Sequence, residues 1–241
     1  MKEVRLNRFL ASCGLGARRQ CERFIVHGLV QINGQTVTEL ATKVDPETDS
    51  VTLRGKDLKP ITSSIHLILN KPAGYVVSCK GFGEKTVFDL LKGMPATLRY
   101  AGRLDKESEG LLFFSTNGEL VNMLTHPRYN MGKIYLVTLD RTLNRKELDI
   151  FRKGVPLDDE LTMPAQIDPL SDTQQCYRVI IHEGKNRQIR RMMQYIGSQV
   201  LRLQRVAFGP LHLGNLPTGA FRKLNKNEIY KLKRNLNLAC L

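Results

Sequence analysis

The chain is organised around one stretch, Gly102-Arg103-Leu104-Asp105-Lys106-Glu107-Ser108-Glu109-Gly110-Leu111-Leu112-Phe113-Phe114. The run 111–116 is short, apolar and preceded by glycine, which predicts a buried strand. Asp105 then lies on a charged loop held by a rigid core, where catalytic groups concentrate. Arg103 would stabilise the ionised carboxylate if its side chain folded back on it. A surface turn with solvated charges fits the same spacing, so the residues alone leave both alternatives open.

The charge of the chain favours a polyanionic partner. Its 241 residues carry 37 Lys and Arg against 23 Asp and Glu, a net charge of +14, and the pI is near 9.8. Such an excess indicates nucleic acid ahead of a membrane surface. Hydrophobic residues make up 41% of the chain, which is enough for the core of one large domain or of two modest ones.

Cysteines and histidines show no metal-binding pattern. The five cysteines form no Cys-x-x-Cys pair and the five histidines no His-x-x-x-His spacing, so we expect reduced thiols, no metal and no cofactor. The segment 10–13 is similar to a lipoprotein cleavage site, but Arg5 and Arg8 lie where an apolar segment is required. No apolar run approaches the ~20 residues of a membrane span. We therefore expect a cytoplasmic protein.

The first 60 residues predict a small basic module. A second helix is expected over 18–27, ending at Gly28, and the run 29–37 predicts a hairpin with Asn33-Gly34 at its turn. The run 59–64 is typical of a linker. A first helix is expected before Gly14, because apolar residues recur at helical spacing: Leu6, Phe9, Leu10 and Cys13.

The remaining residues predict alternating strands and helices. The run 65–78 predicts strand, turn and strand, 86–91 a short helix, and 133–139 a strand that contains Tyr135. Helices are expected to open with capping boxes at Asn144 and Asn225.

A helix that ends near Gly197 divides into two faces. Ile189, Met192, Met193 and Ile196 share the apolar one. The polar face carries Arg187, Arg190, Arg191 and Gln194. Three arginines on one face favour an anion, although solvent would also satisfy them. A strand that contains Leu203 follows this helix.

These segments together resemble the pseudouridine synthases. Asp105 matches the essential aspartate of the family signature, and 108–112 match the Ser-x-Gly-Leu-Leu that follows it. The runs 70–74, 133–137 and 186–192 match the first, second and third motifs of the family. Over nearly the whole chain the arrangement is similar to the bacterial ribosomal-RNA group typified by RsuA and RluB.

The resemblance extends to the basic module. It is similar to the RNA-binding domain first described in a ribosomal small-subunit protein, whose two helices present basic residues to folded RNA. The basic positions of that domain are matched by Arg18, Arg19 and Arg23.

The resemblance implies both a fold and an activity. The fold is α+β, with a helix-helix-hairpin RNA-binding domain over 1–60 and a catalytic domain with a mostly antiparallel, bent sheet over 65–241. The activity is the isomerisation of a specific uridine to pseudouridine in ribosomal RNA, of the large subunit or alternatively of the small one, by a monomer. The main alternative function is that of a non-catalytic RNA-binding or ribosome-assembly protein. A third possibility, a glycosidase that uses Asp105 with Glu107 or Glu109, does not explain the basic module.

The resemblance also implies roles for single residues. Asp105 would act as nucleophile or as a base directed at the sugar, and Arg190 would form an ion pair with it. Tyr135 would stack on the base and take part in proton transfer, and Leu203 would line the uracil pocket. Lys71, in the first motif, could contact a phosphate or be a solvated turn lysine, and we favour the second. Further candidates for substrate binding are Arg103, Arg187 and Arg191.

Overall fold

The computed structural model describes residues 3–61, 63–171 and 175–236. The chain divides into two compact units, Met1–Ile65 with Met94–Arg99 and His66–Gly93 with Tyr100–Leu241. The segment 94–99, predicted to belong to the second domain, groups with the first unit. Within the described ranges, no helix is long and apolar enough to cross a membrane.

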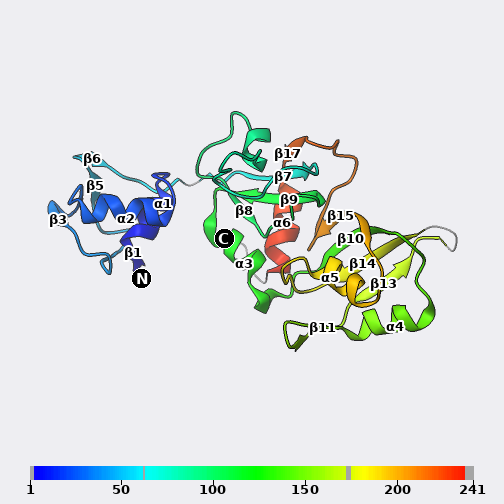
Figure 1. Cartoon of the computed structure of the whole chain (residues 1–241). Coiled ribbons are helices and arrows are strands. Elements are labelled where there is room, and N and C mark those ends of the chain that lie inside the picture. Colours follow the sequence, from blue (N-terminus) through cyan, green and yellow to red (C-terminus); the bar gives the residue numbers. More distant parts are fainter. Residues whose placement is uncertain (1–2, 62, 172–174, 237–241) are drawn as a thin grey trace. The chain divides into compact units, whose positions relative to one another are not determined.

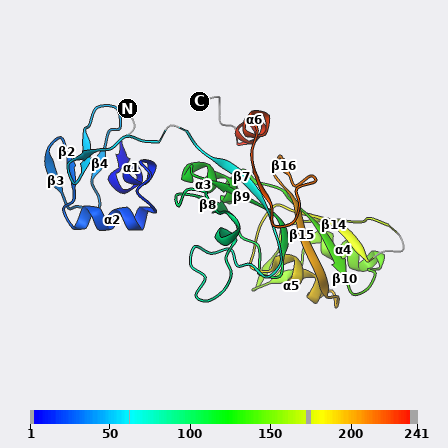
Figure 2. The same ribbon diagram turned by 90° about the horizontal axis from the view of Figure 1, so that it is seen from above.

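The first unit has two helices and a small antiparallel sheet (Figures 1 and 2). Helices α1 (Leu6–Ser12) and α2 (Arg18–Val26) come first, as predicted. The predicted hairpin is confirmed, with Asn33 at φ 51° and Gly34 at φ 81°. The strand order is β3-β2-β5-β6 (Gln35–Val37, Val30–Ile32, Val51–Leu53, Lys56–Asp57), and β1 (Val4–Arg5) pairs with β4 (Lys43–Val44).

Helix α2 turns its polar side to solvent. Its core side chains are Cys21 and Ile25, which are both buried. The helix begins after Ala17, which offers no capping oxygen, and Gln20 Oε1 accepts a hydrogen bond from the Ala17 N–H at 2.9 Å. The three arginines predicted to bind RNA, Arg18, Arg19 and Arg23, are all exposed on this helix.

The second unit is built on a nine-stranded sheet in the order β13-β14-β10-β15-β9-β7-β17, with β16 beside β15 and β8 beside β9 (Figure 1). Neighbours along this order pair antiparallel except β15 and β9, which pair in parallel. The predicted mostly antiparallel α+β fold is confirmed. The strands are β7 (His66–Lys71), β8 (Arg99–Ala101), β9 (Glu109–Ser115), β10 (Lys133–Leu139), β13 (Gln166–Pro169), β14 (Cys176–Ile181), β15 (Val200–Phe208), β16 (Leu211–His212) and β17 (Phe221–Lys223), and a separate hairpin joins β11 (Pro156–Leu157) to β12 (Glu160–Leu161).

The parallel contact between β9 and β15 depends on a glycine. Gly110 faces Arg205 across this contact and has φ 103°. A Cβ at this position would overlap the backbone of Arg205, and few residues other than glycine adopt such a φ. Gly110 therefore lets two strands from distant parts of the sequence meet beside the loop that carries Asp105.

Helices cover both halves of the sheet (Figure 1). Side chains of α3 (Gly118–Thr125) and α6 (Lys226–Asn235) pack with those of β7 and β9 in one core cluster. The predicted capping boxes are present, at Asn144 for α4 (Arg145–Lys153) and at Asn225 for α6. The other helices are α5 (Gln188–Tyr195) and the short 3-10 turns η1 (Val87–Leu90) and η2 (Pro127–Tyr129).

One predicted strand does not form. The run 75–78 makes a single bridge, Val76 with Thr86, instead of a strand. Pro72 and Gly74 turn the chain away from β7, and the N–H of Gly74 donates to the carbonyl of Lys106 at 2.7 Å. The turn is thus tied to the loop of Asp105 instead of extending the sheet.

Candidate active site

The second unit contains a cavity of about 320 Å³ beside the Asp105 loop. This volume lies within the range of small-ligand sites, about 300–1,000 Å³. Its walls come from the loop 102–108, the run 124–131, strand β10, Met163, the run 181–189 and strand β15. Among the predicted site residues, those that line it are Arg103, Asp105, Tyr135, Arg187 and Leu203, whereas Lys71, Arg190 and Arg191 do not.

The side chain of Lys71 holds the loop of Asp105 through hydrogen bonds to its main chain. The Lys71 ammonium donates to the main-chain carbonyls of Asp105 (3.1 Å), Lys106 (3.2 Å) and Ser108 (2.7 Å), and to that of Pro72 (3.0 Å). Burial lowers the pKa of Lys71 to about 8, although the carboxylates of Asp105, Glu107 and Glu109 oppose this shift.

The expectation of a solvated Lys71 is wrong. The residue is 0% exposed, and its ammonium donates to main-chain carbonyls on the protein side, so no N–H is left for water or a phosphate. Apart from Pro72, its carbonyl partners lie 34 to 37 positions later in the sequence, which a local turn pattern does not reveal. Lys71 thus holds the loop of Asp105 in place from inside the protein.

Two neighbouring strands form the inner wall of the cavity. Tyr135 of β10 faces Arg205 of β15, and Leu203 of β15 faces Val137 of β10. Val206 is an extra residue at this point, because the register passes from Ala207 to Arg205 across the pair Ile134 and Tyr135. Bulges of this kind often redirect side chains next to active sites. Here the exposures of Tyr135 and Leu203 are 7% and 6%, so the ring and the aliphatic side chain form an apolar surface.

The predicted ion pair between Arg190 and Asp105 is absent from the structure. Arg190 Nη1 donates instead to the Val200 carbonyl at 3.0 Å, and its buried Nε has no partner among the described residues. Burial and the neighbouring Arg187 lower the pKa of Arg190, and the charges of Asp105 and Glu107 raise it. Arg190 is thus close enough to Asp105 for an electrostatic effect but not for contact.

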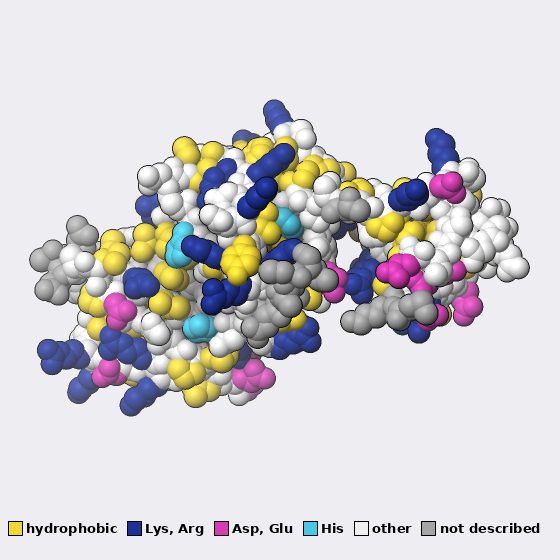
Figure 3. Space-filling view, turned by 180° about the vertical axis from the view of Figure 1, so that it is seen from behind, with side chains coloured by type: hydrophobic (Ala, Val, Ile, Leu, Met, Phe, Trp, Pro, Cys, Tyr) yellow, Lys and Arg dark blue, Asp and Glu magenta, His cyan; other side chains and the backbone are white. Residues whose placement is uncertain are grey.

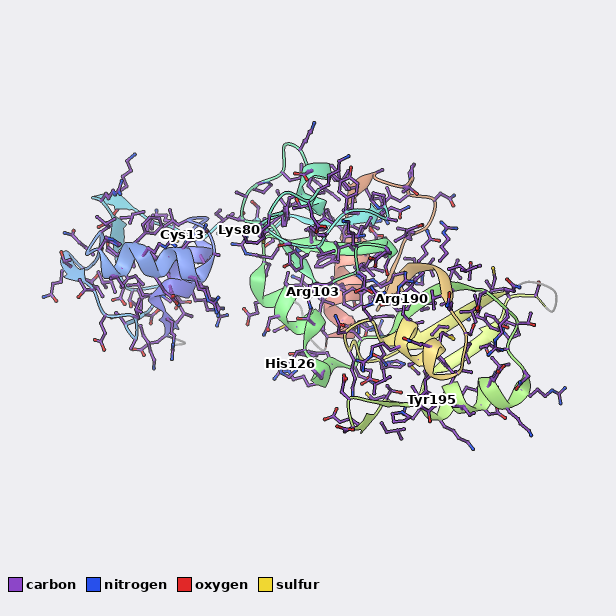
Figure 4. The ribbon with its side chains drawn as sticks, viewed as in Figure 1. Cys13, Lys80, Arg103, His126, Arg190 and Tyr195 are labelled. Carbon is purple, nitrogen blue, oxygen red and sulfur yellow. The ribbon has the colours of Figure 1, made fainter. Side chains whose placement is uncertain are left out.

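The other predicted arginines have different partners. Arg187, at the start of α5, pairs with Glu107 at 3.1 Å, which joins α5 to the loop of Asp105. Arg191 makes two hydrogen bonds with Asp158, at 2.8 and 2.6 Å, outside the cavity. Arg103 is exposed and forms no ion pair with Asp105 within the described residues. Figure 4 shows Arg103 on the loop before β9 and Arg190 on α5, both in the middle of the second unit.

Several basic residues that line the cavity were not predicted as site residues, and Lys133 and Arg205 are two of them. Lys133 Nζ donates to the carbonyls of Met131 and Glu183, at 3.2 Å each, and its pKa falls to about 8, first through burial and then through Arg205. Arg205 is 1% exposed and lines the same cavity. Both occupy inward positions of strands, where sequence alternation predicts apolar side chains. This departure from alternation is the sequence signal by which Lys133 and Arg205 could have been found as site residues.

Known proteins share both units of this chain. A model of the RNA pseudouridylate synthase family matches residues 65–195, and an S4 domain model matches residues 4–50. An uncharacterized RNA pseudouridine synthase of Aquifex aeolicus is 36% identical over 99% of this chain and 97% of its own length. Ribosomal large subunit pseudouridine synthase B of Bacillus subtilis is 34% identical over 95% of each chain.

A solved structure agrees with this match. A crystal structure of pseudouridylate synthase has a TM-score of 0.69 and 30% identity, and it covers 95% of this chain and 99% of that one. The S4 match, the pseudouridylate synthase match and this structural agreement together define the protein as an RNA-modifying enzyme. The chain belongs to the RNA pseudouridylate synthase family.

Proposed function

We propose that the protein isomerises a specific uridine of large-subunit ribosomal RNA to pseudouridine. The observation that carries this proposal is the meeting of Asp105, Tyr135 and Leu203 in one cavity of a chain of this family. Relatives named ribosomal large subunit pseudouridine synthase B, from Bacillus subtilis and Pseudomonas aeruginosa, support the large subunit as the target. The protein would act in the cytoplasm, as a monomer, on ribosomal RNA or on a precursor ribosomal particle.

The reaction breaks the bond between N1 of uracil and the ribose, turns the base and joins C5 to the same sugar carbon. Asp105 supplies the carboxylate, acting on the base or on the sugar. In the described residues its side chain has no ion-pair partner, so it is free to face a substrate. The Tyr135 ring stacks on the base, Leu203 covers one side of the base, and the phenol takes part in proton transfer.

Binding of RNA relies on basic side chains. The target nucleotide must leave its stack to enter the cavity, and phosphate contacts elsewhere offset the energy of unstacking. Arg103 and Arg187 are exposed at the cavity and suit this purpose. Arg18, Arg19 and Arg23 suit it in the first unit. Lys and Arg side chains project from both units on the face in Figure 3.

Tritium release tests the proposal. C5 loses its hydrogen when it takes the glycosidic bond, so RNA labelled with tritium at C5 of uridine releases label in step with the reaction. We expect release from large-subunit RNA and none from small-subunit RNA. Release from small-subunit RNA alone would move the target to the other subunit, and no release from either would favour the non-catalytic RNA-binding alternative.

Tyr135→Phe separates the two roles of the ring. Stacking of an aromatic ring on a base is worth ~1–3 kcal/mol and does not need the hydroxyl, so affinity for RNA should persist. Turnover should fall sharply if the phenol moves a proton. If Tyr135→Phe kept full activity, the phenol would take no part in proton transfer and the role of Tyr135 would be stacking alone.

A further inference from the structure

Arg205 is a buried arginine without an acidic partner. Its Nε donates to the Leu111 carbonyl at 2.8 Å, and its guanidinium carbon lies 5.2 Å from the centre of the Phe208 ring. Nη2 is buried and has no hydrogen-bond partner among the residues that the structure describes. Burying a donor without an acceptor is unfavourable. The contacts on one side of the guanidinium fix its position, and the other side lacks an acceptor.

A second unpartnered group belongs to the same cavity. Ser108 is 1% exposed and lines the cavity, and its hydroxyl oxygen has no partner among the described residues. Ser108 precedes Gly110 by two positions, and Gly110 faces Arg205 in the strand register. The two groups therefore belong to neighbouring parts of the cavity wall. Orphaned donors and acceptors that line a cavity indicate a ligand that completes their hydrogen bonds.

We infer that Arg205 recognises the uracil ring, with Nη2 donating a hydrogen bond to one of its two carbonyl oxygens. This inference rests on the proposed function and adds a specificity residue to it. Uracil carries two carbonyl acceptors, whereas cytosine has an amino group, a donor, in place of one of them. A fixed donor in the cavity wall would hold the base in one orientation during the first half of the reaction.

The surroundings of Arg205 favour a base over a phosphate. Phe208 is 0% exposed and Tyr135 and Leu203 are nearly buried, so the wall beside the guanidinium is apolar. A phosphate is strongly hydrated and is better matched by exposed cations, which the cavity offers in Arg103 and Arg187. A neutral carbonyl group can enter the apolar part at a smaller desolvation penalty.

Atom replacement in the substrate tests the inference. The RNA fragment that the wild-type enzyme modifies is prepared with uridine, 2-thiouridine or 4-thiouridine at the target position, because sulfur is a weak acceptor. On one of the two thio RNAs the wild type should lose roughly 10- to 100-fold in kcat/KM, the range for a hydrogen bond from a charged donor. Arg205→Met should be slower on uridine and should show no such additional loss on either thio RNA.

A matched variant provides the control. Arg202 lies on the same strand, its side chain is 57% exposed, and it pairs with Glu109 outside the cavity lining. Arg202→Met should show the same thio effect as the wild type. Thermal melting checks that each variant folds, and Arg205→Gln, which is shorter and neutral, replaces Arg205→Met if that protein fails to fold.

Two results would overturn the inference. One is an equal thio effect in the wild type and in the Arg205 variant, which would make Arg205 structural. The other is a uniform loss of affinity for all three RNAs without a thio effect, which would assign Arg205 to a phosphate. A wild type that forms no pseudouridine in any RNA would overturn the proposed function itself, and the inference with it.

Discussion

The Lys71 ammonium donates to the main-chain carbonyl of Asp105 at 3.1 Å, so a buried cation from the first family motif holds the residue proposed to carry out the chemistry. Lys71→Met would leave the loop carbonyls without a donor, and a hydrogen bond with a charged group is worth about 1.5–3 kcal/mol. We expect a loss of stability of at least this size in urea unfolding, together with low turnover. Lys106→Met is the matched control, because it removes only a half-exposed ion pair with Glu84, worth ~0–1 kcal/mol. Similar stabilities of the two variants would show that the hydrogen bonds of Lys71 to the loop carbonyls do not stabilise the protein.

The lowered pKa of Lys133 gives the stability a defined pH dependence. Burial lowers the pKa of Lys133 to about 8 from an ordinary value of 10.5. Below pH 8 Lys133 is charged in both states and its contribution is constant. Between pH 8 and 10.5 the unfolded chain binds more protons than the folded one, so this contribution to stability rises with pH. The stability of the wild type minus that of Lys133→Met should therefore increase across this window, and a flat difference would refute the shift.

Asp105→Asn should fold, bind RNA and form no pseudouridine. The amide keeps the size of the side chain and removes the charge on which the chemistry depends. Loss of tritium release with unchanged RNA affinity in a filter-binding assay is the expected result. Glu107→Gln, on the same loop, breaks only the ion pair with Arg187 and should retain most activity. Wild-type rates in Asp105→Asn would remove this residue from the chemistry.

Arg190 and Asp105 should be nearly independent in the stability of the free protein. Breaking a buried ion pair from one side costs ~3–5 kcal/mol, but Arg190 bonds to the Val200 carbonyl and does not contact Asp105. Arg190→Ala should thus lose the ~1.5–3 kcal/mol of a hydrogen bond from a charged donor. In a double-mutant cycle with Asp105→Asn we expect a coupling energy below about 0.5 kcal/mol, typical of residues that share no contact. A coupling above about 2 kcal/mol would mean that the two side chains pair in solution.

The exposed arginines of α2 should control the salt dependence of RNA binding. Arg18→Glu combined with Arg19→Glu removes two candidate phosphate contacts, and each contact contributes about 0.7–0.9 to the slope of log affinity against log salt. We expect weaker binding and a shallower slope, measured by fluorescence anisotropy between low and moderate salt. Lys56→Glu, an exposed change on β6 of the same unit, serves as the control. Equal slopes for the wild type and the α2 double variant would exclude α2 from the RNA surface.

Local signals in the sequence predicted most of the secondary structure. Asn33-Gly34 forms the expected hairpin turn, and Asn144 and Asn225 cap their helices, because each of these patterns acts over three or four residues. The strand expected over 75–78 does not form, because Val76 bonds to Lys85 and Val87 of the following segment instead of to a strand of the sheet.

The site itself was predicted less completely, for a physical reason. Asp105, Tyr135 and Leu203 meet in one cavity as the family resemblance implied. The burial of Lys71 and the position of Arg205 depend on contacts across more than thirty residues, which no local pattern encodes. The partner of Arg190 likewise depends on how α5 packs against β15, and charge periodicity along one helix does not specify that packing.

The order of strands in the large sheet determines when, during translation, the sheet can be completed. β7 begins at His66, but its edge partner β17 is not complete until Lys223. At ~5–20 residues per second the ribosome needs roughly 10–30 s to make the intervening chain. The helices and strands from β1 to β6 lie within the first 60 residues, so they can fold during this interval. The cavity walls on β10 and β15 are still being translated at that time. A nascent chain would then gain a folded S4 domain well before the cavity around Asp105 is complete.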